Sequence, residues 1–336
     1  MTAKRLNTRL LLCVAVPLLV LATAAHLVHG RQMKRHAARA MAEADRAEAE
    51  GHAGQARRSW ARYLTFAPDD GDGLVRYALA LDREGGPPEA RRRALAALRQ
   101  ALARGPVRAE VRRRLVEVAM ELGKFGEARR HLEALLRATP GQAELEETLA
   151  RCAAAEGDFA LAAASLESAA RHAPGRISGQ ARLAEMLRDR LDQPDRAVQV
   201  LDDMVRSNAG SAAAYLARAR YRVADGALSD AAEDLARAAA LAPEDGAVLA
   251  ANAELAERRG DRKAARAHWE RGAVLHPGDV RLCLGLAGAE RTARRLPEAA
   301  ACLRRGLGHK PDQPDLLLAL AEVLAEQGDP AGAGGA

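Results

Sequence analysis

The chain has 336 residues, of which 51 are basic and 45 acidic, so its formal net charge is +6. Aromatic residues make up only 3%, while alanine, leucine and arginine are abundant, a composition that favours α-helices over long β-strands. Residues 1–36 contain six basic residues and no acidic residue, which accounts for the whole excess. The rest of the chain is balanced in charge. We therefore expect no nucleic-acid partner, because binding to a phosphate backbone depends on net basic surface.

An uncharged apolar segment, residues 10–28, follows the basic N-terminal tail of residues 1–9. Its 19 residues are enough to cross a lipid bilayer as a helix. The sequence predicts a transmembrane signal-anchor helix over residues 10–30, which contacts the bilayer through residues 10–28. Residues 31–36 are predicted to be a basic juxtamembrane linker.

A cleaved signal peptide is the alternative for this segment, because Ala22-Thr23-Ala24 resembles a small-residue cleavage site. Apolar residues continue beyond that site through Leu27 and Val28, which favours a retained, single-pass anchor. Three basic residues precede the segment and three follow it, so the positive-inside rule does not decide the orientation of the segment in the membrane. We expect the bulk of the chain on the extracytoplasmic side of a bacterial membrane, with the cytoplasmic face as the alternative.

The dominant pattern beyond the anchor is an internal repeat of about 34 residues, which predicts stacked helix pairs. Prolines mark the period at Pro68, Pro106, Pro140, Pro174, Pro243, Pro277 and Pro311. Twelve residues before each proline stands an alanine, at Ala56, Ala94, Ala128, Ala162, Ala231, Ala265 and Ala299. Eight residues before each proline stands a large apolar residue, at Trp60, Leu98, Leu132, Leu166, Leu235, Trp269 and Leu303. A turn glycine recurs upstream, at Gly51, Gly123, Gly157, Gly226 and Gly260.

This pattern resembles the tetratricopeptide repeat, in which a turn glycine, an aromatic residue, a close-packing alanine and a proline recur over 34 residues. Gly157-Asp158-Phe159-Ala160-Leu161-Ala162 is one example, and Tyr215-Leu216-Ala217 resembles the opening of a first helix in such repeats. The resemblance implies an all-α fold, a right-handed superhelical solenoid of stacked helix-turn-helix repeats, here preceded by one transmembrane helix.

Counting from the prolines divides residues 37–313 into eight repeats. Their spans are 37–70, 71–108, 109–142, 143–176, 177–211, 212–245, 246–279 and 280–313. Residues 314–327 are predicted to be a terminal capping helix or a truncated ninth repeat, and residues 328–336 a flexible Gly/Ala tail. A single helix pair cannot bury its apolar face alone, so the repeats should be stable only by stacking on one another.

No catalytic or metal-binding motif is found in the sequence. The four cysteines show no C-x-x-C spacing, the histidines are scattered, and neither a nucleotide-binding loop nor a nucleophile motif is present. We therefore expect no enzymatic activity, no cofactor and no metal. An enzyme with a site hidden between repeats remains the least favoured of three hypotheses.

The resemblance implies that protein or peptide partners bind the concave surface formed by the first helix of each repeat. Mapping the family's groove positions onto this sequence gives Arg113, Arg114, Glu117, Glu147, Arg151, Arg182, Glu185, Arg220, Glu254 and Glu257. The Lys and Asn pattern by which some family members bind a peptide's C-terminal carboxylate is missing. We expect a membrane-tethered bacterial scaffold for protein–protein interactions, and the second hypothesis is an accessory component of a polysaccharide or envelope-protein export assembly.

Overall fold

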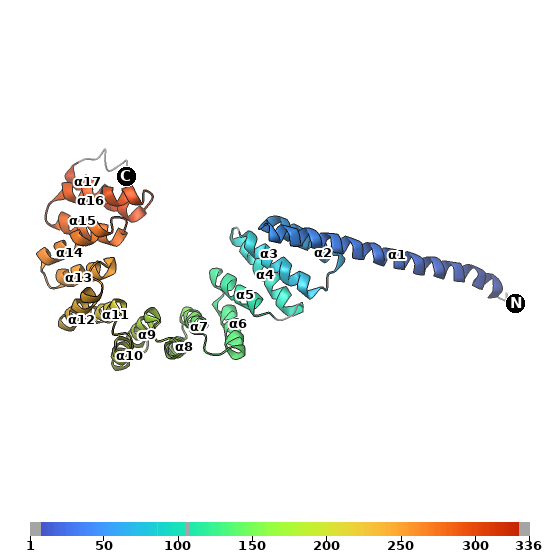
Figure 1. Ribbon diagram of the computed structural model, residues 1–336, viewed down its shortest axis with the longest axis horizontal. Helices are drawn as coiled ribbons and strands as arrows, with labels where there is room; N and C mark the ends of the chain where they lie inside the picture. Colours follow the sequence, from blue (N-terminus) through green and yellow to red (C-terminus); the bar gives the residue numbers. More distant parts are fainter. Residues whose placement is uncertain (1–7, 86, 105–107, 329–336) are drawn as a thin grey trace, which may run out of the picture. The chain divides into compact units, whose positions relative to one another are not determined.

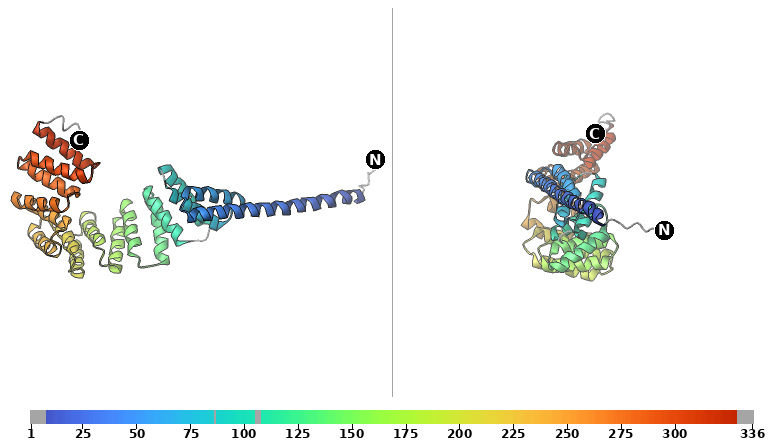
Figure 2. Two further views of the ribbon diagram at one scale, coloured as in Figure 1. Left: turned by 45° about the horizontal axis from the view of Figure 1, so that its top comes forward. Right: turned by 90° about the vertical axis from the view of Figure 1, so that its right-hand side faces the viewer.

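The computed structural model describes the backbone of residues 8–85, 87–104 and 108–328, and within these ranges the side chains from residue 28 onward. All regular structure in the described residues is helical, with 17 helices and no strand. The chain divides into two compact units, Met1–Asp158 and Phe159–Ala336. In each unit consecutive helices pack against one another as hairpins (Figures 1 and 2).

Unit 1 contains seven helices. They are α1 Thr8–Ala49, α2 Ala53–Phe66, α3 Gly71–Glu84, α4 Pro88–Arg104, α5 Ala109–Glu121, α6 Phe125–Ala138 and α7 Ala143–Ala155. Helix α1 is continuous, and its C-terminal part packs on α2 through the buried residues Ala40, Ala44 and Ala47. Residues 31–36 therefore belong to the same helix as the first packed residues of unit 1.

The predicted transmembrane helix, residues 10–30, lies outside the residues whose side chains are described, apart from Val28, His29 and Gly30. Within the part of the chain whose side chains are described, no helix combines the length and hydropathy needed to cross a membrane.

Unit 2 contains ten helices. They are α8 Phe159–His172, α9 Ile177–Asp189, α10 Pro194–Ser207, α11 Ala212–Ala224, α12 Leu228–Leu241, α13 Gly246–Arg258, α14 Arg262–Leu275, α15 Val280–Thr292, α16 Leu296–His309 and α17 Pro314–Gln327. Each odd-numbered helix from α9 to α15 also contacts the next odd-numbered helix. These helices thus form one layer and the even-numbered helices another.

The repeat residues set the helix boundaries. A first helix begins three residues after a repeat proline, as at Pro140 with α7 and Pro277 with α15, because proline cannot continue the preceding helix. The turn glycines have positive φ angles of 68° to 82° at Gly51, Gly123, Gly157, Gly226 and Gly260. Asp192 and Arg294 adopt left-handed φ angles of 51° and 58° in the corresponding turns, where a side chain makes this conformation costly.

The periodic alanines and large apolar residues form the core of each helix pair. All seven alanines, from Ala56 to Ala299, are at most 1% exposed, which allows the two helices of a pair to approach closely. The large residues eight positions before each proline are at most 3% exposed. Both tryptophans carry an additional contact: Nε1 of Trp60 donates to Glu48 and Nε1 of Trp269 donates to Glu257, each at 2.8 Å. These bonds fix the last turn of a first helix to the second helix of its pair.

Candidate protein-binding surface

One hollow in unit 1 is a cavity of about 670 Å³ between α5, α6 and α7. Its apolar floor is formed by Val116, Met120, Leu132, Leu135 and Leu145. Polar side chains form its rim, at Arg113, Glu117, Glu121, Gln142, Glu144, Thr148 and Arg151. An apolar floor within a ring of polar groups is the usual construction of a site that buries part of a ligand.

A second cavity of about 560 Å³ adjoins the first along α5. It lies between α3 and α5, and it shares Arg113 and Glu117 with the first cavity. Together the two cavities form a hollow over α3, α5 and α7, which we call the unit 1 groove. Asp70 caps the N-terminus of α3, because its side chain accepts a hydrogen bond from the Gly73 backbone N–H. This cap stabilises the start of the helix that borders the groove on one side. Asp70 also accepts from the Tyr63 hydroxyl at 2.8 Å, and burial together with this bond raises the pKa of Tyr63 to about 12.

The four sequence-predicted residues that line the unit 1 groove are Arg113, Arg114, Glu117 and Arg151. Arg114 is engaged inside the protein, because it contacts both the buried carboxylate of Asp82 and the neighbouring Glu117. The hydrogen bond to Asp82 raises the pKa of Arg114. Arg113 and Arg151 are exposed on the rim; Arg113 donates to Oε1 of Gln142 at 2.8 Å. These two arginines are thus the ones placed to meet a ligand.

The remaining predicted residues are dispersed. Glu147, on α7, is half-buried and is not among the residues that line the unit 1 groove. In unit 2, Arg182 and Glu185 are exposed on α9. Arg220 and Glu254 line a smaller cavity of about 250 Å³, where Arg281 donates to Glu254 at 2.9 Å.

Glu257 has a structural partner, because its carboxylate accepts the Trp269 hydrogen bond. The residues of the apolar floor were not predicted from the sequence as site residues, because they follow the same periodicity as the core residues.

Among the side chains that the structure describes, histidine, cysteine and acidic residues do not gather into a metal site. Cys283 and Cys302 lie together in unit 2, where the Cys302 thiol donates to the backbone carbonyl of Cys283 at 3.6 Å. The interaction of the two side chains lowers the pKa of Cys283 and raises that of Cys302. Both cysteines are at most 3% exposed, so neither thiol can reach a substrate. In the described residues, no group of three or more histidine, cysteine, aspartate or glutamate side chains could hold a metal ion.

Comparison with known proteins gives the family. Models of the tetratricopeptide repeat match residues 89–152, and again residues 250–314 and 284–336. The chain contains tetratricopeptide repeats at these residues. Repeats of this family generally bind protein partners, which indicates a scaffold for protein–protein interactions, and their proteins are typically non-catalytic. No curated protein matches this chain in sequence.

Several solved structures are similar to this chain. A repeat protein from Parabacteroides merdae is 14% identical with a TM-score of 0.47, and the match covers 86% of this chain and 99% of that chain. The C-terminal part of a repeat-containing protein from Cytophaga hutchinsonii is 16% identical with a TM-score of 0.49, covering 73% and 99%. The APC/C hetero-tetramer Cut9–Hcn1 is 18% identical with a TM-score of 0.45, covering 83% of this chain. The match spans only 54% of that chain.

Proposed function

We propose that this protein is a membrane-tethered bacterial scaffold that holds a segment of a protein partner in the unit 1 groove. The observation that carries the proposal is the groove itself, an apolar floor between α5 and α7 bordered by Arg113 and Arg151. Large apolar side chains of the partner would be buried on the floor, which supplies most of the binding free energy. The charged rim would orient the segment and reject mismatched partners.

Site-specific photo-crosslinking in native membranes tests the groove. A photoreactive amino acid at Thr148 lies on the rim, and its crosslinks to a partner should fall at least tenfold when Arg113→Glu and Arg151→Glu are combined. The matched control combines Arg130→Glu and Arg137→Glu, two exposed arginines of α6, and should leave the crosslinks unchanged. Equal loss in both variants would mean that net charge matters and the groove does not.

We also propose that residues 10–28 anchor the chain in the membrane and that the repeats lie outside the cytoplasm. The support is the apolar segment in the sequence together with its helical continuity into the first packed helix of unit 1. A rigid connection of this kind would keep the unit 1 groove near the bilayer. An accessory role in a polysaccharide or envelope-protein export assembly is a narrower form of this proposal, which copurification with a membrane complex would distinguish from a free scaffold.

Two reporters fused after Ala336, one active only in the cytoplasm and one only outside it, test the anchor. We expect full-length protein in the membrane fraction and activity of the extracytoplasmic reporter. A shortened soluble product would overturn the anchor in favour of a cleaved signal peptide. Full-length membrane protein with an active cytoplasmic reporter would reverse the orientation.

A further inference from the structure

A cavity of about 710 Å³ in unit 2 lies between α14 and the C-terminal end of α15, at the edge where the turns of two neighbouring helix pairs meet. We call it the edge cavity. Small residues form much of its lining, among them Ala265, Gly288, Ala289 and Ala293. A Cβ atom added to Gly288 would have no atom within 4 Å, so the space beyond this residue is open.

Comparison among the repeats explains why the cavity is there. The tenth residue of the first helix is larger than alanine in the pairs from α5 to α13, as Val118, Cys152, Met186, Tyr221 and Leu255. In α15 the tenth residue is Ala289, and Gly288 precedes it. Helix α3 also has alanine at this position, Ala80, but Leu79 precedes it and Ala80 packs against Trp60. Among the described first helices from α3 to α15, only α15 therefore has an alanine at this position with a glycine before it.

Tyr221 shows what kind of group occupies the equivalent position two repeats earlier. Its side chain is 6% exposed, and the Arg188 guanidinium lies over its ring at 4.6 Å. An aromatic ring beneath a cation is a favourable arrangement in itself. The edge cavity lies at the equivalent position of its own repeat, where no aromatic ring is present. Cationic side chains also line it.

The charged side chains that line the edge cavity favour an acidic ligand. Its lining contains four cations, Arg262, Lys263, Arg266 and Arg295, and two acidic residues, Glu257 and Glu270. Arg266 and Arg295 each lie 2.7 Å from the buried carboxylate of Glu290, and Glu257 is bonded to Trp269. Arg262 and Lys263 are exposed and make no ion pair with any described residue. The rim is therefore positive at the two side chains that are free to move toward a ligand.

We propose that the edge cavity binds an acidic segment of a protein partner, which inserts one aromatic side chain at Ala289 while its carboxylates contact Arg262 and Lys263. This inference rests on the proposed function as a protein-binding scaffold, but it assigns a second surface in a different unit. The aromatic ring would take the place that Tyr221 occupies in its own repeat. The flanking carboxylates would select acidic partners and make binding weaker at high salt.

The test uses the full-length chain in detergent and a fluorescent probe peptide, acetyl-Asp-Glu-Phe-Asp-Glu-amide, followed by fluorescence anisotropy. Saturable binding is expected, at least tenfold weaker when the peptide's phenylalanine is replaced by alanine. In the protein, Ala289→Tyr should fill the cavity and weaken binding at least tenfold. The combined Arg262→Glu and Lys263→Glu variant should do the same and changes only exposed side chains, so it remains informative if Ala289→Tyr fails to fold.

The matched control reverses Arg304 and Arg305, two exposed arginines of α16 that do not line the cavity, and should bind as the wild type does. Absence of saturable binding, or equal binding by wild type and the Arg262/Lys263 variant, would overturn the inference. The Arg113→Glu and Arg151→Glu variant should still bind the probe. A failure of the groove proposal would thereby leave this result untouched, and the two failures remain distinguishable.

Discussion

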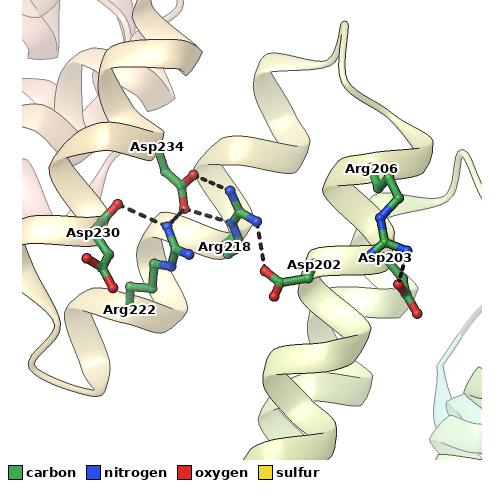
Figure 3. A network of polar contacts seen from close by, with 7 residues as sticks. All are labelled: Asp202, Asp203, Arg206, Arg218, Arg222, Asp230 and Asp234. Carbon is green, nitrogen blue, oxygen red and sulfur yellow. Dashed lines mark hydrogen bonds and ion pairs between the residues drawn. The ribbon is translucent and has the colours of Figure 1, made fainter.

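Replacing Asp234 with alanine is expected to lower the free energy of unfolding of unit 2 by about 3 kcal/mol. The Asp234 carboxylate is 3% exposed and accepts hydrogen bonds from Nε and Nη2 of Arg218, at 3.0 and 2.6 Å, and from Nη1 of Arg222, at 2.8 Å (Figure 3). Arg218 also pairs with Asp202 at 2.8 Å, so the network joins α10, α11 and α12. Removing the central carboxylate leaves two largely buried guanidinium groups without their main acceptor.

Hydrogen exchange of the amides of α10, α11 and α12 in the full-length protein measures this effect locally. Asp203→Ala is the matched control, because Asp203 pairs with Arg206 at 2.8 Å on the same helix and both side chains are more than half exposed (Figure 3). Such a surface pair should change stability by less than about 0.5 kcal/mol. Similar exchange in the two variants would show that the Asp234 network does not hold these helices together.

The sequence predicts the helix pairs because each of their boundaries has a local cause. Proline ends the preceding second helix, a left-handed glycine makes the turn, and alanine allows close approach, so spacing alone indicates where helices begin and end. The exceptions are the turns at Asp192 and Arg294, where the left-handed residue is not glycine. There the residue after the left-handed position still donates to the end of the first helix, Gln193 to Leu187 at 2.8 Å and Arg295 to Glu290 at 2.9 Å, so the turn is kept without the glycine that would mark it in the sequence.

The candidate site was less predictable, because it depends on contacts between residues far apart in sequence. Arg113 and Arg114 are adjacent and chemically identical, yet only Arg114 reaches Asp82, which is 32 residues away. Neighbouring residues on a helix point in different directions, and the sequence does not tell which of them meets a buried carboxylate. Glu257 shows the same limit, since its hydrogen bond to Trp269 becomes visible only when the two helices are placed together.

Cavities were the least predictable feature. Gly288 and Ala289 match none of the repeat positions that the sequence pattern marks, and in the structure both line the edge cavity. Gly285, three residues earlier on the same helix, does serve close approach. The repeat periodicity does not distinguish Gly285 from Gly288, because the difference lies in what each residue faces. Gly285 faces its packing partner, and Gly288 faces a gap that the preceding repeat borders.

The two glycines of α15 should respond in opposite ways to the same substitution. Gly285→Ala is expected to lower the free energy of unfolding by about 2 kcal/mol, because the new Cβ would lie 2.5 Å from Cδ2 and Cε3 of Trp269. That ring is 3% exposed and bonded to Glu257, so it has little room to move. Gly288→Ala should instead raise the free energy of unfolding by about 0.5 to 1 kcal/mol, since alanine favours the helix and meets no atom.

Urea denaturation of the two full-length variants, followed by hydrogen exchange in α15, measures both changes against the wild type. The comparison is internally controlled, because each variant adds one methyl group to the same helix. Destabilisation by Gly288→Ala would mean that the space beside this residue is filled, and the edge cavity would then be too small to admit an aromatic side chain. Stabilisation by Gly285→Ala would mean that Trp269 can move away from α15, so that its bond to Glu257 does not hold it in place.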